Sequence, residues 1–209
     1  MRLYHHPMSS NARRAVMTAL HLGALPKSPS IELVPVDLGK GEQRAPSFLR
    51  MNPNGRVPVL EDEGFFLTES HAIMQHLAES TPGQKIYPTE PRARADVNRW
   101  LFWCACHFQP AMRILGYEKF IKPRFGLGET DPVEVKRGEA LVLEVSSVLD
   151  AHLAGRAWVV GESLTLADLA LGTALMLTVP AKLPVLEYAH LQAWFARVQE
   201  LDVWKRTSL

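Results

Sequence analysis

The chain has 209 residues, of which 47% are hydrophobic, and a formal net charge of +1. This is enough apolar material for one large or two small globular domains with a buried core. The 23 basic residues are scattered among 22 acidic ones, and no apolar run approaches the roughly 18 residues that span a bilayer. We therefore expect neither nucleic acid nor a membrane as a partner. Because no signal-peptide pattern opens the chain, we expect a cytoplasmic location.

Strand and helix patterns alternate over the first 80 residues. Four strands are predicted, at 2–5, 31–38, 56–62 and 64–68. Three helices are predicted, at 11–22, 45–52 and 69–80. The order βαβαββα predicts a parallel pair joined by a crossover helix and a closing antiparallel hairpin. Residues 1–80 are thus predicted to form an α/β domain with a mixed sheet.

A proline-rich segment then separates two kinds of pattern. The stretch TPGQKIYPTEPR, residues 81–92, has three prolines and a glycine, and no strand pattern follows it. It predicts a linker between the α/β domain and an all-helical domain at 93–209. Two long helices are predicted there from apolar stripes at 97, 101, 104, 108 and 112 and at 141, 145, 148 and 152. Residues 115–132 between them are predicted to be a long loop.

Several polar residues of the helical half have structural interpretations. Thr165 stands three residues before Asp168 at the head of an apolar-periodic segment, which predicts a capping box. Cys104 and Cys106 are two residues apart on a predicted helix, so their side chains point about 200° apart and are poorly placed to form a disulfide. Cys104 and His107 share a helix face, but two ligands fall short of the four that a structural metal site needs. We expect no metal.

The order and spacing of several motifs resemble those of the cytosolic glutathione transferases. The motifs are the βαβαββα half, NPNGRVPVLED, TESHAI opening a helix, the proline-rich linker and the capping box. Together they span essentially the whole chain. The resemblance implies a thioredoxin-like N-terminal domain, a helical C-terminal domain, a homodimer and a role in detoxification with glutathione as co-substrate.

The segment MSSNARRAV resembles the serine-type classes (phi, theta and zeta), in a bacterial-type form. In these classes a serine just before the first helix is the catalytic residue, and the match falls on Ser9. A beta-class alignment instead places Ser10 at that class's cysteine, which makes Ser10 the runner-up. Tyr4 lies inside the first strand and is discounted. Asn11 stands where the zeta isomerases carry a cysteine, which argues against maleylacetoacetate isomerase activity.

The chemistry implied for Ser9 is hydrogen-bond donation to a thiolate. The thiolate of glutathione is the nucleophile, and a hydroxyl that donates to it lowers the pKa of the thiol. Without the resemblance, a serine pair before a helix is better explained as a helix cap. Arg13 and Arg14, further along the same helix, are predicted to face outward, or one of them to brace the helix against the second domain.

Each end of glutathione has candidate ligands in this sequence. Glu69 is expected to pair with the α-ammonium of the γ-glutamyl group, and Ser70 with the helix start to take its α-carboxylate; the alternative is a cap alone. The resemblance implies a cis Val57-Pro58 bond, with the Val57 backbone pairing with the cysteinyl residue.

The glycine carboxylate needs a cation or a donor. Gln43 and Arg44 align with a His-Lys pair of the phi class, and Lys40 or Arg56 competes with them. A solvated surface role is the alternative for each of these loop residues.

The electrophile pocket is expected between the domains. Its candidate residues are Trp103, His107, Phe108, Met112 and Tyr117. A stripe of aromatic and methionine side chains at helical spacing is more often part of a core than of a pocket.

The sequence leaves three functions open. The first is a glutathione transferase that conjugates small hydrophobic electrophiles, and the second a glutathione-dependent peroxidase or disulfide-bond reductase. The third is a ligand-binding or interaction protein of this fold without turnover, which the presence of Ser9, Glu69 and Ser70 disfavours.

Overall fold

The computed structural model describes residues 1–23, 29–185 and 187–208. The chain divides into two compact units, one made of Met1–Pro88 with Leu201–Leu209 and one of Thr89–Glu200. The first division falls inside the segment predicted as a linker. The last nine residues join the first unit, whereas the sequence places them in the helical domain.

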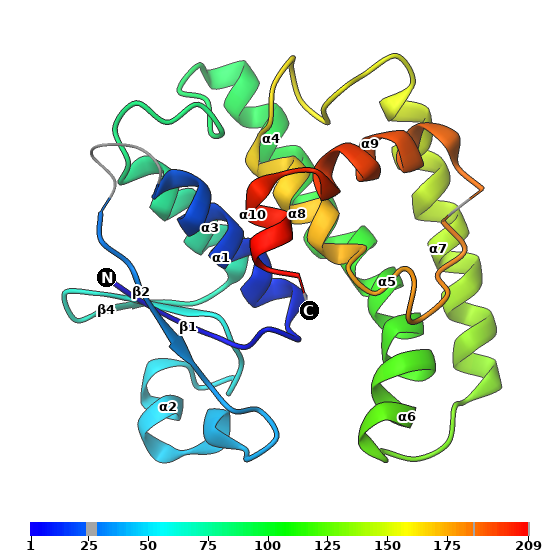
Figure 1. Cartoon of the computed structure of the whole chain (residues 1–209), viewed down its shortest axis with the longest axis horizontal. Helices are drawn as coiled ribbons and strands as arrows, with labels where there is room; N and C mark the ends of the chain where they lie inside the picture. The colour runs from blue at the N-terminus through cyan, green and yellow to red at the C-terminus, as the bar shows by residue number, and fades with distance from the viewer. Residues whose placement is uncertain (24–28, 186, 209) are drawn as a thin grey trace. The chain divides into compact units, whose positions relative to one another are not determined.

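The first unit contains one four-stranded sheet of order β2-β1-β3-β4 (Figure 1). Its strands are β1 (Arg2–His5), β2 (Glu32–Pro35), β3 (Val59–Asp62) and β4 (Phe65–Leu67). β1 pairs in parallel with β2, while β3 is antiparallel to both β1 and β4. This confirms the predicted mixed sheet.

Short helices complete the first unit. They are α1 (Ser10–Leu22), the 3-10 turn η1 (Glu42–Arg44), α2 (Pro46–Met51), α3 (Ser70–Glu79) and the C-terminal α10 (Asp202–Arg206). α1 lies beside α3 and also contacts α10 (Figure 1). Between α1, α3 and the sheet lies a core of fully buried side chains that includes Leu3, Met17, Leu60, Ile73 and Leu77.

The second unit is helical throughout its regular structure. Its elements are α4 (Pro91–Trp103), the π-helical η2 (Cys104–Phe108), α5 (Gln109–Gly116), the π-helical η3 (Tyr117–Ile121), α6 (Lys122–Phe125), α7 (Pro132–Leu153), α8 (Leu166–Ala174) and α9 (Ala189–Gln199). All five residues of the first predicted stripe, at 97, 101, 104, 108 and 112, are buried. The α/β plus all-α fold class is confirmed.

The long loop predicted at 115–132 is wrong over most of its length. Residues through Phe125 are helical, and only 126–131 connect α6 to α7. Pro123 is the second residue of α6, which continues directly from η3. Glu118 is buried and pairs with Lys122 at 2.8 Å, one turn further along. These contacts stabilise a helical segment. Its glycine and proline residues had suggested a loop.

The predicted stripe of α7 is partly out of phase. Val145 is buried, as expected, but Val148 is 49% exposed. The buried face instead includes Gly138, Val142 and Leu149. A Cβ on Gly138 would come within 2.8 Å of Ile114, so glycine allows α7 to approach α5 closely.

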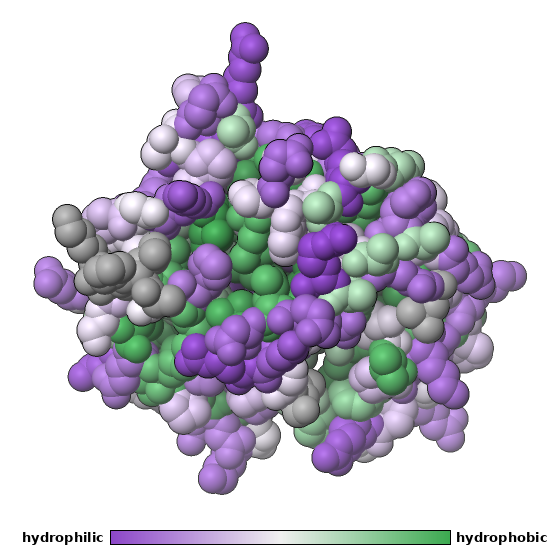
Figure 2. Space-filling model, turned by 45° about the horizontal axis from the view of Figure 1, so that its top comes forward, coloured by the Kyte–Doolittle hydropathy of each residue, from purple (hydrophilic) through white to green (hydrophobic). Residues whose placement is uncertain are grey.

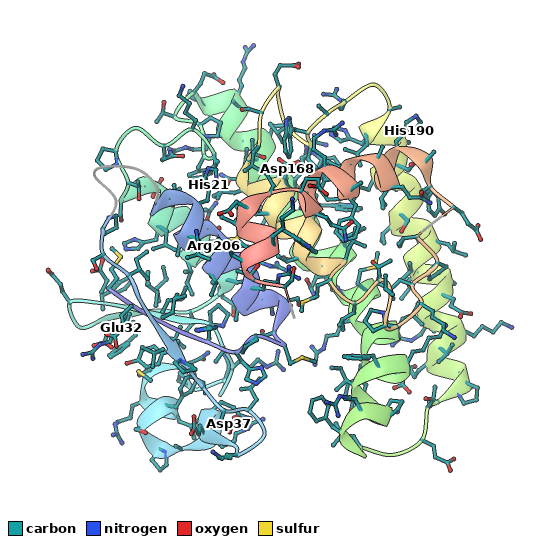
Figure 3. The ribbon with its side chains drawn as sticks, viewed as in Figure 1. His21, Glu32, Asp37, Asp168, His190 and Arg206 are labelled. Atoms are coloured by element: carbon teal, nitrogen blue, oxygen red, sulfur yellow. The ribbon has the colours of Figure 1, made fainter. Side chains whose placement is uncertain are left out.

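Asp168 joins three parts of the helical unit (Figure 3). The capping box with Thr165 at the start of α8 is present. The same carboxylate also accepts hydrogen bonds from the Val159 N–H and the Trp194 indole N–H, each at 2.9 Å. Burial raises the pKa of Asp168, and the donated hydrogen bonds oppose that rise.

Three further features concern possible membrane spans, the surface and the cysteines. Within the described residues, no helix is long and apolar enough to cross a membrane. The face seen in Figure 2 carries hydrophilic side chains around its rim and both hydrophilic and hydrophobic side chains toward its middle. Cys104 is buried and Cys106 is exposed, and both are free thiols.

We expect Asp168→Ala to lower the free energy of unfolding by about 3 kcal/mol or more, because it leaves a buried indole N–H and backbone N–H groups without an acceptor. Urea unfolding measures the loss. Asp202→Ala removes a carboxylate that is 77% exposed and should cost no more than about 0.5 kcal/mol. Equally small losses in the two variants would contradict the structural role of Asp168.

Candidate functional site

A cavity of about 350 Å³ lies within the first unit. It is walled by eight residues from the start of α1, the loop between α2 and β3, and the start of α3: Asn11, Asn52, Asn54, Arg56, Val57, Pro58, Glu69 and Ser70. The wall is predominantly polar, and it carries one cation and one carboxylate. Such a cavity suits a small zwitterionic ligand.

Ser9 caps the helix that begins at this cavity. It is the N-cap of α1, and its Oγ accepts a hydrogen bond from the Ala12 N–H at 3.2 Å. A hydroxyl has two acceptor lone pairs and one donor hydrogen, so the cap leaves the Ser9 O–H available to donate. Ser10 is the first residue of α1. The capping and thiol-binding interpretations of Ser9 are therefore compatible.

Tyr4 has a different partner. Its hydroxyl donates to Glu61 Oε2 at 2.8 Å. The ring packs edge-on against Phe48, with the ring centroids 6.3 Å apart. These contacts hold the Tyr4 side chain on β1, which agrees with the expectation that Tyr4 is not the residue that contacts the thiol.

The prediction that Arg13 and Arg14 face outward is wrong. Arg13 is 5% exposed and Arg14 is 1% exposed. The Arg13 guanidinium lies over the Trp204 ring, 3.8 Å from its centroid, and donates to the Trp204 carbonyl at 3.0 Å. Burial lowers the pKa of Arg13 to about 10. The face of α1 that carries these arginines was expected to be exposed to solvent. It is covered by α3 and by α10, and α10 comes from the far end of the chain.

Arg14 contacts the third helix. Its Nη1 meets Nε2 of His71, the second residue of α3. Burial, and then the Arg14 charge, lower the pKa of His71 to about 3. His71 is therefore neutral at neutral pH.

The loop before β3 is held by its own asparagine. Asn52 Nδ2 donates to the Arg56 carbonyl at 2.7 Å, and Asn52 Oδ1 accepts from the Asn54 N–H at 3.0 Å. Gly55 has a φ of 58°, and a Cβ there would come within 3.0 Å of the Gln43 carbonyl. The Val57-Pro58 peptide bond that follows is cis. This loop places Arg56 and Val57 on the cavity wall.

The start of α3 has an unusual backbone. Glu69 is the N-cap residue and has a φ of 65°, in the left-handed region that non-glycine residues seldom adopt. Ser70 next to it is 7% exposed. Glu69 and Ser70 both line the cavity, and the N-terminus of α3 that begins beside them has N–H groups without partners inside the helix.

The other predicted cations lie off this wall. Arg44 and Lys40 are exposed, and Lys40 pairs with Asp37 at 3.4 Å. Asp37, in the loop after β2 (Figure 3), also accepts the N–H groups of Gly39 and Lys40, which lower the pKa of its carboxyl. Gln43 is half-buried and donates weakly to the Leu38 carbonyl at 3.5 Å.

Both parts of the chain match known protein families. Residues 1–79 match the N-terminal domain of glutathione S-transferases, and residues 103–202 match the C-terminal domain. Glutathione S-transferase F10 of Arabidopsis thaliana is 30% identical, with 97% of this chain and 94% of the relative covered. Glutathione S-transferase 3 of Zea mays is 32% identical, with coverages of 99% and 92%. The chain belongs to the glutathione S-transferase family.

Solved structures of other glutathione transferases share this fold. Glutathione transferase F7 from Populus trichocarpa has a TM-score of 0.86 at 29% identity and covers 99% of this chain, with 96% of its own length covered. Glutathione S-transferase-I, solved with lactoylglutathione bound, has a TM-score of 0.85 at 26% identity, with coverages of 99% and 97%. The curated relatives described above are plant proteins, so the bacterial-type form stays a prediction.

In this glutathione transferase chain, the structure brings together four of the residues predicted to bind glutathione, and Arg56, a competing candidate for the glycine carboxylate, lies on the same wall. Val57, Pro58, Glu69 and Ser70 all line the cavity. Sequence analysis missed Asn11, Asn52 and Asn54 as wall residues. The available signal was the NPNG stretch, because asparagine beside glycine and proline indicates a turn whose side chain bonds the backbone.

The proposed electrophile residues differ in exposure within the helical unit. Phe108 and Met112 are 0% and 3% exposed and belong to the core. Trp103 is half-buried and stacks on Phe108, with ring centroids 5.4 Å apart. Only Trp103, His107 and Tyr117 of the five candidates offer surface to a ligand in this unit.

We expect His71 to make stability depend on pH. Its pKa is lower in the folded protein, about 3, than the ordinary 6.5, so its contribution is complete above pH 6.5 and is lost as the pH falls toward 3. Since pH 5 lies about 1.5 units below 6.5, the loss there is about 2 kcal/mol. Urea unfolding of wild type and His71→Gln at pH 7.5 and pH 5 measures this, because the contributions of the other histidines cancel. Parallel pH dependences in the two proteins would contradict it.

Proposed function

We propose that the chain binds glutathione in the cavity of the first unit, stabilises its thiolate with the Ser9 hydroxyl and conjugates it to small hydrophobic electrophiles. The observation that carries this proposal is the shared cavity wall of Val57, Glu69 and Ser70, beside the helix that Ser9 caps. No other group is needed for the chemistry, since the nucleophile belongs to the substrate.

The energies are sufficient for thiol activation at neutral pH. A free thiol has a pKa of about 8.5, so only about 3% is ionised at pH 7. A charge-assisted hydrogen bond from Ser9 is worth roughly 1.5 to 3 kcal/mol, and the α1 N-terminus adds about 0.3 to 1 kcal/mol. Together they lower the pKa of the bound thiol to about 6.5. Most of the bound glutathione is then thiolate.

The γ-glutamyl end fits the start of α3. Its α-ammonium pairs with Glu69, and its α-carboxylate accepts hydrogen bonds from Ser70 and the free N–H groups of the helix. The cysteinyl residue pairs with the backbone of Val57. This arrangement pairs both charges of the γ-glutamyl group, the ammonium and the carboxylate, at the start of α3.

For the glycine carboxylate, the position of Arg56 favours it over the aligned pair Gln43 and Arg44. Arg56 lies on the cavity wall, while Gln43, Arg44 and Lys40 do not. A guanidinium can bind a carboxylate with two parallel hydrogen bonds. We assign Arg56 this role in the proposal.

In the helical unit, the candidates to contact the electrophile are Trp103, His107 and Tyr117. Phe65 and Phe66 are 55% and 40% exposed on β4, an edge strand, which supports a homodimer through this edge. We place the protein in the cytoplasm.

We expect Ser9→Ala to raise the pKa of bound glutathione by one to two units, because the donor to the sulfur anion is lost. Ser10→Ala is the matched control and should leave this pKa within about 0.3 units of wild type. The measurement is a pH titration of the thiolate absorbance of the complex. A rise in Ser10→Ala alone would move the assignment to Ser10, and wild-type protein that binds no glutathione would refute the function.

A truncated ligand isolates the role of Arg56. We expect Arg56→Ala to weaken glutathione binding roughly tenfold through the loss of a charge-assisted pair. γ-Glutamylcysteine lacks the glycine carboxylate, so wild type and Arg56→Ala should bind it within about twofold of each other. Isothermal titration calorimetry with both ligands, and Arg44→Ala as the control, gives the comparison. Equal weakening toward both ligands would remove Arg56 from the glycine end.

A further inference from the structure

A contact between a buried arginine and a half-buried histidine links the two helices that begin at the cavity. Arg14 of α1 is almost fully buried, and its Nη1 contacts Nε2 of His71 on α3. Because a guanidinium can only donate, Nε2 of His71 must be the acceptor, and the ring hydrogen is on Nδ1. Neither side chain is on the cavity wall. The link therefore connects the helices without occupying the ligand's place.

His71 is next in sequence to the residues proposed to hold the γ-glutamyl group. It follows Ser70 directly, and Glu69 has its backbone in the left-handed region, with a φ of 65°. A non-glycine residue keeps such a conformation only where the surrounding structure holds it. The contact with Arg14 fixes the first turn of α3 immediately after this residue.

Arg14 lies on the helix that Ser9 caps, and the backbone of that helix connects the two residues. The Arg13 N–H donates to the Ser9 carbonyl at 2.8 Å, and Ser9 Oγ caps the Ala12 N–H. The Arg14 carbonyl in turn accepts from Thr18 Oγ1 at 2.8 Å. One hydrogen-bonded stretch of α1 therefore carries both the proposed thiol donor and the arginine that contacts α3.

We propose that Arg14 and His71 form a positioning pair that sets the spacing between the thiol donor Ser9 and the γ-glutamyl anchor Glu69–Ser70. This inference rests on the proposed function. A ligand anchored at its γ-glutamyl end brings its sulfur to Ser9 only when the starts of α1 and α3 keep their spacing. Loosening the pair misplaces the sulfur by a fraction of an ångström, which weakens a hydrogen bond whose strength depends steeply on geometry.

Three variants separate positioning from stability. His71→Leu removes the acceptor and leaves the buried guanidinium without it. His71→Gln keeps an acceptor oxygen near the position of Nε2. The double variant Arg14→Met/His71→Leu replaces both partners with apolar groups of similar size, which is often nearly neutral for stability. The readouts are urea unfolding, the pKa of bound glutathione, and kcat and KM with a standard aryl halide electrophile.

We expect His71→Leu and the double variant to raise the pKa of the bound thiol by about one unit and to lower kcat/KM for glutathione roughly tenfold. His71→Gln should return kcat/KM to within about threefold of wild type. If His71→Leu does not fold, the double variant alone provides the comparison with wild type.

A folded double variant with the wild-type thiol pKa and kcat/KM would overturn the inference, as would a folded His71→Gln protein as impaired as His71→Leu. Ser9→Ala distinguishes these failures from failure of the proposed function. If Ser9→Ala raises the thiol pKa and the double variant does not, only the positioning pair is refuted. If Ser9→Ala leaves the thiol pKa unchanged, the assignment of Ser9 as the thiol donor falls and this inference with it, and wild-type protein that binds no glutathione refutes the proposed function itself.

Discussion

The spacing of two helix N-termini around one cavity is the constraint on which the site depends. α1 and α3 pack side by side in the first unit, and both begin at the cavity wall, with Asn11 from one and Ser70 from the other. Helix N-termini present free N–H groups and a partial positive charge. A ligand with a carboxylate at one point and a sulfur anion at another matches this pair of positive ends. The chemistry proposed here needs no catalytic side chain beyond a correctly placed hydroxyl.

Local patterns were sufficient to predict most of the fold. The short strands predicted around Arg2–His5 and Val59–Asp62, the hairpin turn at Glu63 and Gly64, and the stripe beginning at Val97 all correspond to observed elements. These signals operate over a few residues and do not require knowledge of distant neighbours. The four cavity-lining residues Val57, Pro58, Glu69 and Ser70 were predicted because they lie in short contiguous motifs that carry the family resemblance.

The wrong predictions for Arg13 and Arg14 have a common physical origin in contacts between distant residues. Arg13 bonds residues more than 190 positions away, and Arg14 meets a histidine 57 positions away. A charged residue on a helix is usually solvated, so its burial cannot be predicted until its covering partner is known. Asn11 was missed for a similar reason, because its place on the cavity wall depends on loops that precede β3 and α3.

The most direct test of the central claim is a crystal structure of the protein with glutathione bound. If Ser9 stabilises the thiolate, the sulfur lies within hydrogen-bond distance of Ser9 Oγ, and the γ-glutamyl α-carboxylate lies at Ser70 and the start of α3. A sulfur atom that contacts Ser10 or Asn11 instead, or a glutathione molecule bound outside this cavity, would contradict it.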